Sequence, residues 1–202
     1  SVENKDIHSK YENFWKVELD NKKGLTVVEI IHKILEDEIK SMYIMGENPA
    51  MSDPDQNHAR EALAKLDHLV VQDIFMTETA WHADVILPSS AHAEKTGTFT
   101  NTNRQVQLGR QAVPPPGDAR QDWWITQAIA QRMGLDWSYL HPRDVFNEMA
   151  QVMPSLKNIT YERLESENSV TYPCDDPNKP GNEIIFNEKF PTANGRGKIV
   201  PA

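Results

Sequence analysis

The chain of 202 residues contains little cysteine and no long apolar run. Cys174 is its single cysteine, so no internal disulfide and no CxxC metal site can form. No apolar run reaches the roughly 18 residues that a transmembrane helix needs. Acidic residues outnumber basic ones, 30 to 21, and a net charge of −9 argues against nucleic-acid binding as the main task. A hydrophobic content of 39% is ordinary for a globular protein, and the length allows one sizeable domain and part of a second.

Residues 1–25 are polar with scattered aromatic side chains, and we expect them to form a lead-in segment with one short helix. The first ten residues lack the apolar core of a signal peptide, so a cytoplasmic location is the default expectation. The chain opens on Ser1 in place of a methionine, and we therefore expect it to be processed or cut from a longer protein.

Residues 26–168 alternate between helical and strand-like patterns. Thr26 and Glu29 have the spacing of a capping box and open an expected helix over 26–38. Short apolar runs that end in turn residues predict three strands, and helical patterns separate them. Such alternation with short loops implies parallel pairing and a Rossmann-like three-layer α/β domain. The expected strands are 41–45, 68–75 and 83–87, and the helices between them are 54–66 and 77–81.

The second half of the chain is less regular. Residues 98–111 are β-prone but polar, and we expect a hairpin or an extended excursion off the sheet; further helices are expected over 143–152 and 160–166. A long amphipathic helix is expected over 118–134. Its inward side chains should be Trp124, Ile125, Ala128, Ile129 and Met133. From residue 169 onward, proline and glycine interrupt short β-like pieces at Ile184–Phe186 and Lys198–Val200. We interpret 169–202 as an irregular, β-prone tail that links to a separate β-rich domain.

Polar residues follow the expected strands. Gly46 would let the backbone approach a ligand, and Asn48 and Ser52 could add hydrogen bonds to phosphate oxygens. The alternative is an ordinary strand-to-helix turn. Ser89 is placed to contact a phosphate, although a serine in a loop usually has no special role.

Two aspartates are further candidates for binding a nucleotide. Asp73, preceded by Gln72, ends a strand, where a carboxylate can bind ribose hydroxyls or accept both N–H groups on the edge of a guanine. Asp122 opens the expected long helix and is either a second acid of a nucleotide pocket or a partner of the helix dipole. Asp73 could equally be a helix N-cap or a solvated turn residue.

Other reactive side chains lack partners in the sequence. His82 and His92 have no further ligands at metal-binding spacing, and we interpret them as surface histidines. Glu94 and Lys95 form an ion pair of small effect or an active-site pair. Cys174 has no nearby histidine and is interpreted as structural. The chain therefore offers no candidate catalytic residue and no candidate metal ligand.

The order of the motifs is more specific than any one of them. Gly-Glu-Asn-Pro is followed by Gln-Asp, Ala-Asp-Val-Ile-Leu-Pro-Ser, Glu-Lys-x-Gly-Thr-Phe-x-Asn and then Asp-Trp before an Ile-rich helix. Over about residues 40–140 this series resembles the molybdopterin oxidoreductase family. Within the family it is most similar to the alpha (catalytic) subunits of molybdenum-dependent formate dehydrogenases. The resemblance continues more loosely toward the C-terminus.

The resemblance implies that 26–168 is part of a larger, discontinuous domain that binds one molybdopterin guanine dinucleotide. Asn48 stands where some relatives carry aspartate, and Ser52 where some carry threonine, and both changes keep a hydrogen-bonding side chain. Asp73 or Asp122 would meet the guanine edge. The cofactor-binding residues carried over by position are Gly46, Glu47, Asn48, Ser52, Gln72, Asp73, Ser89 and Asp122.

The resemblance also implies what lies outside this chain. The cysteine or selenocysteine that ligates molybdenum or tungsten, and the cysteines of a 4Fe-4S centre, are upstream of the matching region in the family. The fragment alone should be inactive and hold no cofactor, whereas the intact enzyme would oxidise formate to carbon dioxide. Its partners would be the rest of its own chain and electron-transfer subunits, with no nucleic acid and no membrane segment.

Three alternatives stay open. A nitrate reductase-like relative would keep the cofactor and change the substrate. A structural relative, as in respiratory NADH dehydrogenase, would keep the fold without molybdenum. A generic nucleotide-binding module is disfavoured, because the chain has neither G-x-G-x-x-G nor G-x-x-x-x-G-K-[ST].

Overall fold

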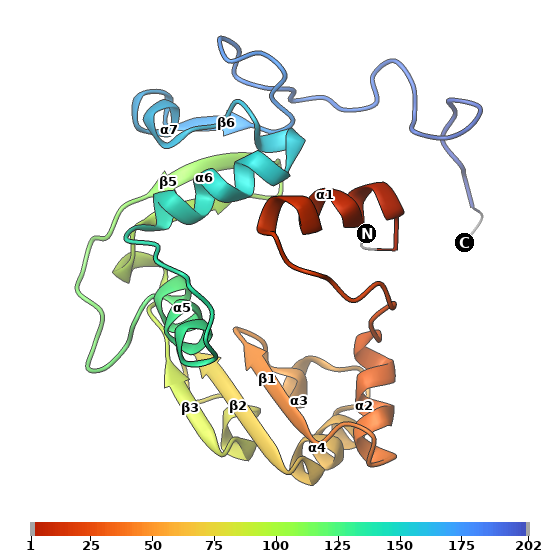
Figure 1. The fold of residues 1–202 in the computed structure, drawn as a ribbon, viewed down its shortest axis with the longest axis vertical. Coiled ribbons are helices and arrows are strands. Elements are labelled where there is room, and N and C mark those ends of the chain that lie inside the picture. The colour runs from red at the N-terminus through yellow and green to blue at the C-terminus, as the bar shows by residue number, and fades with distance from the viewer. Residues whose placement is uncertain (1–2, 201–202) are drawn as a thin grey trace. The chain divides into compact units, whose positions relative to one another are not determined.

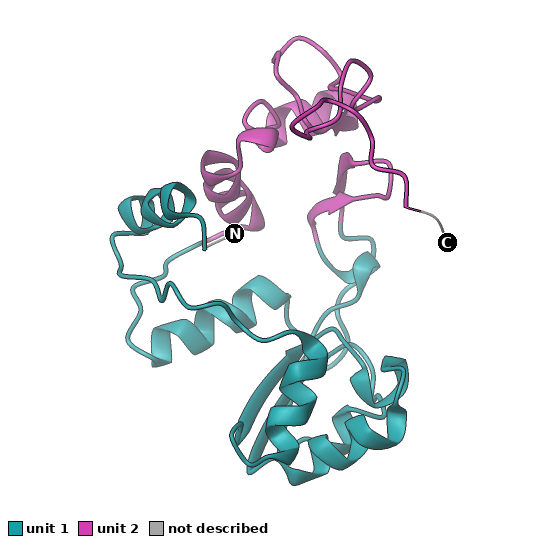
Figure 2. Ribbon diagram, turned by 90° about the vertical axis from the view of Figure 1, so that its right-hand side faces the viewer, with its two compact units in different colours: residues 1–95, 111–139 teal, residues 96–110, 140–202 magenta. Residues whose placement is uncertain are grey.

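The computed structural model describes residues 3–200 and divides the chain into two compact units. The first unit comprises residues up to 95 and 111–139, and the second comprises 96–110 and the residues from 140 onward (Figure 2). Residues 140–168 thus belong to the same compact unit as the tail. The domain boundaries of the protein, with a dinucleotide-binding domain over 26–168 and a linker over 169–202, stay a prediction.

The centre of the first unit is a parallel sheet of three strands (Figure 1). These are β1 (Ser41–Met45), β2 (His68–Asp73) and β3 (Val85–Pro88), in the order β1-β2-β3. Both pairs are parallel, which confirms the predicted pairing and the α/β class. The strands also lie where the apolar runs predicted them, with ends shifted by at most two residues.

Helices cover this sheet from both faces. On one face, Ile44, Leu69 and Val71 pack in a core with Ala50 of α3 and Leu63 of α4. Neighbouring residues of a strand point to opposite faces, so Gln72 turns to the other face, where it bonds to the start of α5. The three layers follow from this alternation. The elements are α2 (Val27–Leu35), α3 (Pro49–Ser52), α4 (Gln56–Lys65), the 3-10 turns η1 (Ala80–His82) and η2 (His92–Glu94), and α5 (Asp122–Arg132).

The capping box at the start of α2 is confirmed. Glu29 N donates to Thr26 Oγ1 at 3.3 Å, and Thr26 N donates to Glu29 Oε2 at 2.7 Å. Helix α1 (Lys5–Trp15) is the short helix expected in the lead-in segment, and Asn4 caps it. The short helix α3 was not predicted, because its four residues are too few to show a period.

The predicted inward face of α5 is partly wrong. Trp124 and Met133 are 47% and 76% exposed. The buried residues of the helix are Ile125, Gln127 and Ala130. Gln127 can be buried because its amide is satisfied: Nε2 donates to the Tyr139 carbonyl at 3.0 Å, and Oε1 accepts from Tyr139 N at 2.7 Å. Ile125 was predicted correctly, but an apolar pattern cannot reveal a buried glutamine, so the predicted face is rotated from the buried one.

The second unit has an antiparallel sheet in the order β4-β5-β6, and its hairpin β4-β5 was predicted. Leu164, Val106, Val170 and the buried Cys174 belong to one core cluster. The pieces Ile184–Phe186 and Lys198–Val200 are not strands, because no neighbouring strand in the described chain pairs with them, and Ile199 is 93% exposed. The elements are β4 (Gly97–Thr100), β5 (Gln105–Gly109), α6 (Pro142–Val152), η3 (Pro154–Leu156), α7 (Tyr161–Glu167) and β6 (Ser169–Thr171).

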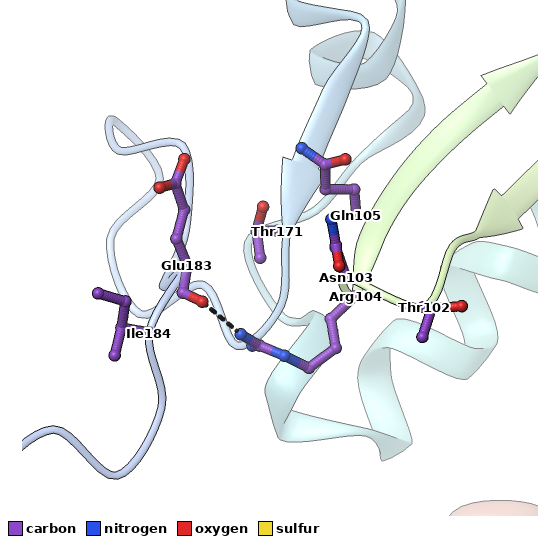
Figure 3. A pocket seen from close by; sticks show the side chains of 7 residues that line it. All are labelled: Thr102, Asn103, Arg104, Gln105, Thr171, Glu183 and Ile184. Atoms are coloured by element: carbon purple, nitrogen blue, oxygen red, sulfur yellow. Dashed lines mark hydrogen bonds between the residues drawn. The ribbon is translucent and has the colours of Figure 1, made fainter.

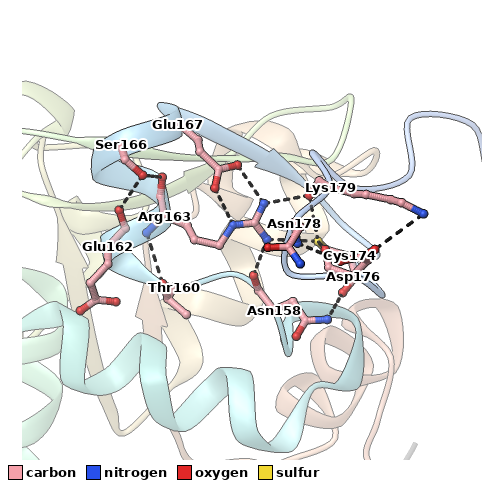
Figure 4. A network of polar contacts seen from close by, with 10 residues as sticks. All are labelled: Asn158, Thr160, Glu162, Arg163, Ser166, Glu167, Cys174, Asp176, Asn178 and Lys179. Atoms are coloured by element: carbon pink, nitrogen blue, oxygen red, sulfur yellow. Dashed lines mark hydrogen bonds and ion pairs between the residues drawn. The ribbon is translucent and has the colours of Figure 1, made fainter.

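A polar network fastens the segment after β6 onto α7 (Figure 4). Arg163 makes a two-pronged ion pair with Glu167, with Nε–Oε1 at 2.7 Å and a second nitrogen to Oε2 at 2.8 Å. The same guanidinium donates to the carbonyls of Asn158 and Lys179 and to Cys174 Sγ at 3.4 Å. Cys174 is therefore a packed, hydrogen-bonded residue, as the structural interpretation expected.

Candidate nucleotide site at the carboxyl edge of the sheet

The carboxyl ends of β1, β2 and β3 lie along one edge of the parallel sheet, which is where open α/β sheets bind their ligands. Gly46 follows β1, Asp73 ends β2 and Ser89 follows β3. Backbone bonds hold these positions together. Gly46 N donates to the Gln72 carbonyl at 2.9 Å, and Ser89 N donates to the Asp73 carbonyl at 3.0 Å. The structure therefore brings Gly46, Asp73 and Ser89 to one edge of the sheet, as the motifs predicted.

Gly46 meets both requirements for close approach by a ligand. Its φ of +66° lies in the left-handed region that side chains disfavour. No heavy atom lies within 4 Å of the place where its Cβ would be. The backbone at the end of β1 is thus open, and the exposed Glu47 follows it.

Asn48 is engaged within the protein. Its Oδ1 accepts from Thr79 Oγ1 at 2.8 Å and from Thr79 N at 3.1 Å, while its Nδ2 donates to Glu78 at 2.7 Å. Thr79 is fully buried, and its hydroxyl also accepts from Ala50 N at 3.0 Å. Asn48 therefore ties the loop after β2 to the start of α3. Ser52, at the other end of α3, is exposed.

We predict that Asn48→Ala lowers the free energy of unfolding by about 2 kcal/mol, because the N–H and the hydroxyl of the buried Thr79 both lose their shared acceptor. Asn48→Asp keeps the acceptor for Thr79 but places a second carboxylate beside Glu78; because Glu78 is exposed and can turn to solvent, this variant should cost less than Asn48→Ala. Urea unfolding followed by circular dichroism measures both values. Equal losses in the two variants would contradict the role assigned to this oxygen.

A polar chain of four residues crosses the edge, and we call it the edge chain: Tyr43, Gln72, Asp122 and Lys95. Gln72 is fully buried; its Oε1 accepts from the Tyr43 hydroxyl, and its Nε2 donates to Asp122 Oδ1 at 2.8 Å. Lys95 Nζ reaches Asp122 Oδ2 at 2.6 Å. Gln72 and Asp122 were predicted as site residues, and the structure joins them. Tyr43 and Lys95 were not predicted.

Lys95 differs from its sequence interpretation as a partner of Glu94. Glu94 instead accepts from the backbone N–H of Ala91 at 2.8 Å, closing the turn η2. The Glu-Lys pair in the sequence was a visible signal, but nothing in it identified Asp122, 27 residues away, as the partner.

The residues of the edge chain shift the pKa values of Asp122 and Tyr43. Burial acts to raise the pKa of Asp122, but the hydrogen bonds from Lys95 and Gln72 outweigh it and hold that pKa below its ordinary value. Burial and the neighbouring Asp122 carboxylate raise the pKa of Tyr43. At neutral pH the site therefore presents an ionised Asp122 beside a neutral phenol.

Asp73 differs from Asp122 in its free acceptor capacity. Its Oδ1 accepts from Ile74 N at 2.6 Å, whereas its Oδ2 has no hydrogen bond within residues 3–200. Beyond β3, Ser89 and Ser90 are buried, and Ser90 Oγ has no partner among the residues described. The edge thus keeps an open carboxylate oxygen at Asp73 and open space at Gly46, which suit a nucleotide with N–H donors and phosphate oxygens, whereas the Ser90 hydroxyl is buried behind them.

The second unit contains a cavity of about 550 Å³ lined by the turn between β4 and β5 (Figure 3). Arg104 donates there to the carbonyls of Tyr172, Asn182 and Glu183, so its charge holds the tail in place. Over 3–200, no group of three or more His, Cys, Asp or Glu residues is arranged to hold a metal. No helix in that range is long and apolar enough to cross a membrane.

Comparison with known proteins gives the family. The model of the molybdopterin oxidoreductase family matches residues 4–132, which include the whole strand edge. The chain belongs to the molybdopterin oxidoreductase family. A solved structure of acetylene hydratase from Pelobacter acetylenicus has the same fold, with a TM-score of 0.60 over 85% of this chain and 24% of that one, at 20% identity.

Several curated relatives are formate dehydrogenases by name. The chain is 49% identical over 97% of its length to the F420-dependent formate dehydrogenase subunit alpha of Methanocaldococcus jannaschii. It is 48% identical over 80% of its length to the putative formate dehydrogenase YrhE of Bacillus subtilis. It covers 29% and 16% of these proteins, so it corresponds to a segment of each.

Proposed function

We propose that this chain is a segment of a formate dehydrogenase catalytic subunit and that its strand edge binds one molybdopterin guanine dinucleotide. The observation that carries the proposal is the 49% identity to a formate dehydrogenase alpha subunit across 97% of the chain. The open strand edge supports it, because the cofactor-binding residues inferred from the resemblance gather there.

Each part of the edge fits one part of the dinucleotide. The open space at Gly46, whose own N–H is bonded to the Gln72 carbonyl, would let the phosphates approach, and the hydroxyls of Ser52 and Ser89 would hold them, with Glu47 near the ribose. Asn48 contributes by fixing the loop beside them. Asp73 would accept the two N–H groups of the guanine edge, because its Oδ2 is free and its Oδ1 keeps a second lone pair beside the bond from Ile74 N, whereas side chains hold both oxygens of Asp122. Of the two acids that the sequence offered for the guanine edge, we therefore propose Asp73.

In the intact enzyme, the bound molybdenum or tungsten cofactor would supply the oxidation of formate to carbon dioxide, with the electrons passing to a 4Fe-4S centre. The residues of this chain bind and orient the dinucleotide and take no part in the chemistry. We therefore expect the 202-residue chain alone to be inactive and free of cofactor. In the cytoplasm, its partners would be the rest of the catalytic subunit and electron-transfer subunits.

The test uses the intact catalytic subunit, produced without oxygen. We expect it to contain molybdenum or tungsten together with guanine nucleotide and to reduce a redox dye when formate is added. Metal without formate-dependent reduction would move the substrate to the nitrate reductase-like alternative. A fully matured preparation without metal or guanine nucleotide would contradict the proposal and favour a structural relative.

A further inference from the structure

The cavity of about 550 Å³ in the second unit has a polar lining that the proposed function does not use. Its lining residues come from the turn between β4 and β5, from β6 and from the segment after β6 (Figure 3). All of them belong to one compact unit, so the cavity does not depend on how the two units are arranged. Its volume lies in the range of sites that bind small molecules.

Arg104 brings a positive charge to this cavity and has no carboxylate partner within residues 3–200. Its Nη1 donates to the carbonyls of Tyr172 and Asn182, and its Nη2 donates to that of Glu183 at 2.8 Å. A guanidinium has five N–H groups, so the Nε–H and one N–H of Nη2 have no acceptor among the residues described. Figure 3 shows that Glu183 turns its carbonyl toward Arg104 and its carboxylate away. Neutral groups therefore hold the cation in place without neutralising its charge.

The turn between β4 and β5 holds Arg104 in a conformation that side chains disfavour. Its φ of +65° lies in the left-handed region. Two bonds to Asn101 stabilise the turn there, because Arg104 N donates to the Asn101 carbonyl at 2.9 Å and Gln105 N donates to Asn101 Oδ1 at 3.0 Å. The position of the guanidinium is thus fixed by the protein before any ligand is present.

Other side chains at the cavity also have hydrogen-bond donors without acceptors. Asn101 Nδ2 donates to Gln105 Oε1 at 2.9 Å, which leaves the amide nitrogen of Gln105 free. In the described part of the chain, no side-chain hydrogen bond involves Thr102 or Asn103. The Thr171 hydroxyl has none there either, although Thr171 is only 5% exposed and buried hydroxyls are normally paired. The cavity therefore lacks a group that is rich in acceptors.

We propose that this cavity is a binding site for a small oxyanion, in which a phosphate or carboxylate group pairs with Arg104. Both groups combine negative charge with several acceptor oxygens, and they match a cation surrounded by unused donors. Because the guanidinium is already held in place, binding an anion orders few additional bonds of its side chain. The inference does not rest on the proposed function, since no residue of this cavity belongs to the strand edge.

The test titrates inorganic phosphate and malonate into the intact protein by calorimetry, in a phosphate-free buffer with little chloride. We expect at least one of them to bind with a dissociation constant of about 1 mM or lower. Arg104→Gln should weaken this binding at least about 10-fold, because it removes a charge-assisted contact. Thr171→Val removes one neutral donor and should weaken it about 3-fold. Binding of phosphate alone assigns the site to phosphate groups, and binding of malonate alone assigns it to carboxylates.

Arg132→Gln is the matched control. Arg132 also donates to a main-chain carbonyl, that of Ala128 at 2.8 Å, but it does not line the cavity, so this variant should bind as the unmodified protein does. The inference is wrong if neither anion binds the unmodified protein. It is equally wrong if Arg104→Gln and Thr171→Val bind as tightly as Arg132→Gln. Should Arg104→Gln not fold, because Arg104 also holds the tail, Thr171→Val decides alone, and unchanged affinity in that variant overturns the site.

Discussion

Replacing Gly46 by valine should remove most of the guanine dinucleotide that co-purifies with the intact subunit. The left-handed φ of +66° strains any side chain by roughly 1–2 kcal/mol, and a β-branched one most. The new side chain would also fill the open space at the end of β1, where we propose the phosphates approach. We expect the retained nucleotide, released by acid and quantified per polypeptide, to fall by at least about 10-fold, because backbone bonds to phosphate are charge-assisted.

Gly24→Val is the matched control. Gly24 also has no heavy atom within 4 Å of an added Cβ, but it precedes α2, and its φ lies outside the left-handed region. It should therefore retain nucleotide at the unmodified level. If Gly46→Val is as well folded and as fully loaded as Gly24→Val, the strand end after β1 does not approach the ligand.

Much of the first unit was predictable because its parts are local. A capping box, short apolar runs and turn residues such as Gly46 each act within a few residues, and α2 and β1–β3 formed where these signals lay. The buried face of α5 was not predictable in the same way. Gln127 is buried because the backbone of Tyr139 satisfies its amide, and that partner is known only once the chain has folded back.

In the candidate site, too, local signals were predictable from the sequence and distant partners were not. The residues at the strand ends could be selected from the sequence, because parallel strands bring their carboxyl ends to one edge. Their partners could not: Lys95 stood beside Glu94 in the sequence and bonds to Asp122 in the fold. Asn48 was expected to face a ligand, yet its side chain holds the buried Thr79. Sequence order identifies which residues gather, whereas hydrogen bonding decides which of them remain free for a ligand.

That distinction leads to the sharpest test of the site, which is Asp73→Asn. A carboxylate accepts from both N1–H and the N2 amino group of guanine, whereas a carboxamide presents one acceptor and one donor. The donor would face the N2 amino group, so the affinity for guanosine diphosphate should fall by about 100-fold, because one charge-assisted bond is lost and the other loses its charge. Xanthosine diphosphate carries a carbonyl at that position and should bind the variant better than the guanine nucleotide does.

The reversal of base preference separates recognition from damage to the fold, because a misfolded variant would lose both nucleotides. Asp122→Asn is the internal comparison. Both oxygens of Asp122 are bonded within the protein, so this variant should weaken both nucleotides without reversing their order. A reversal in Asp122→Asn and none in Asp73→Asn would show that Asp122 meets the base and would place the guanine at the start of α5. Calorimetric titration of the two variants with the two nucleotides thus decides which acid at this edge recognises the ligand.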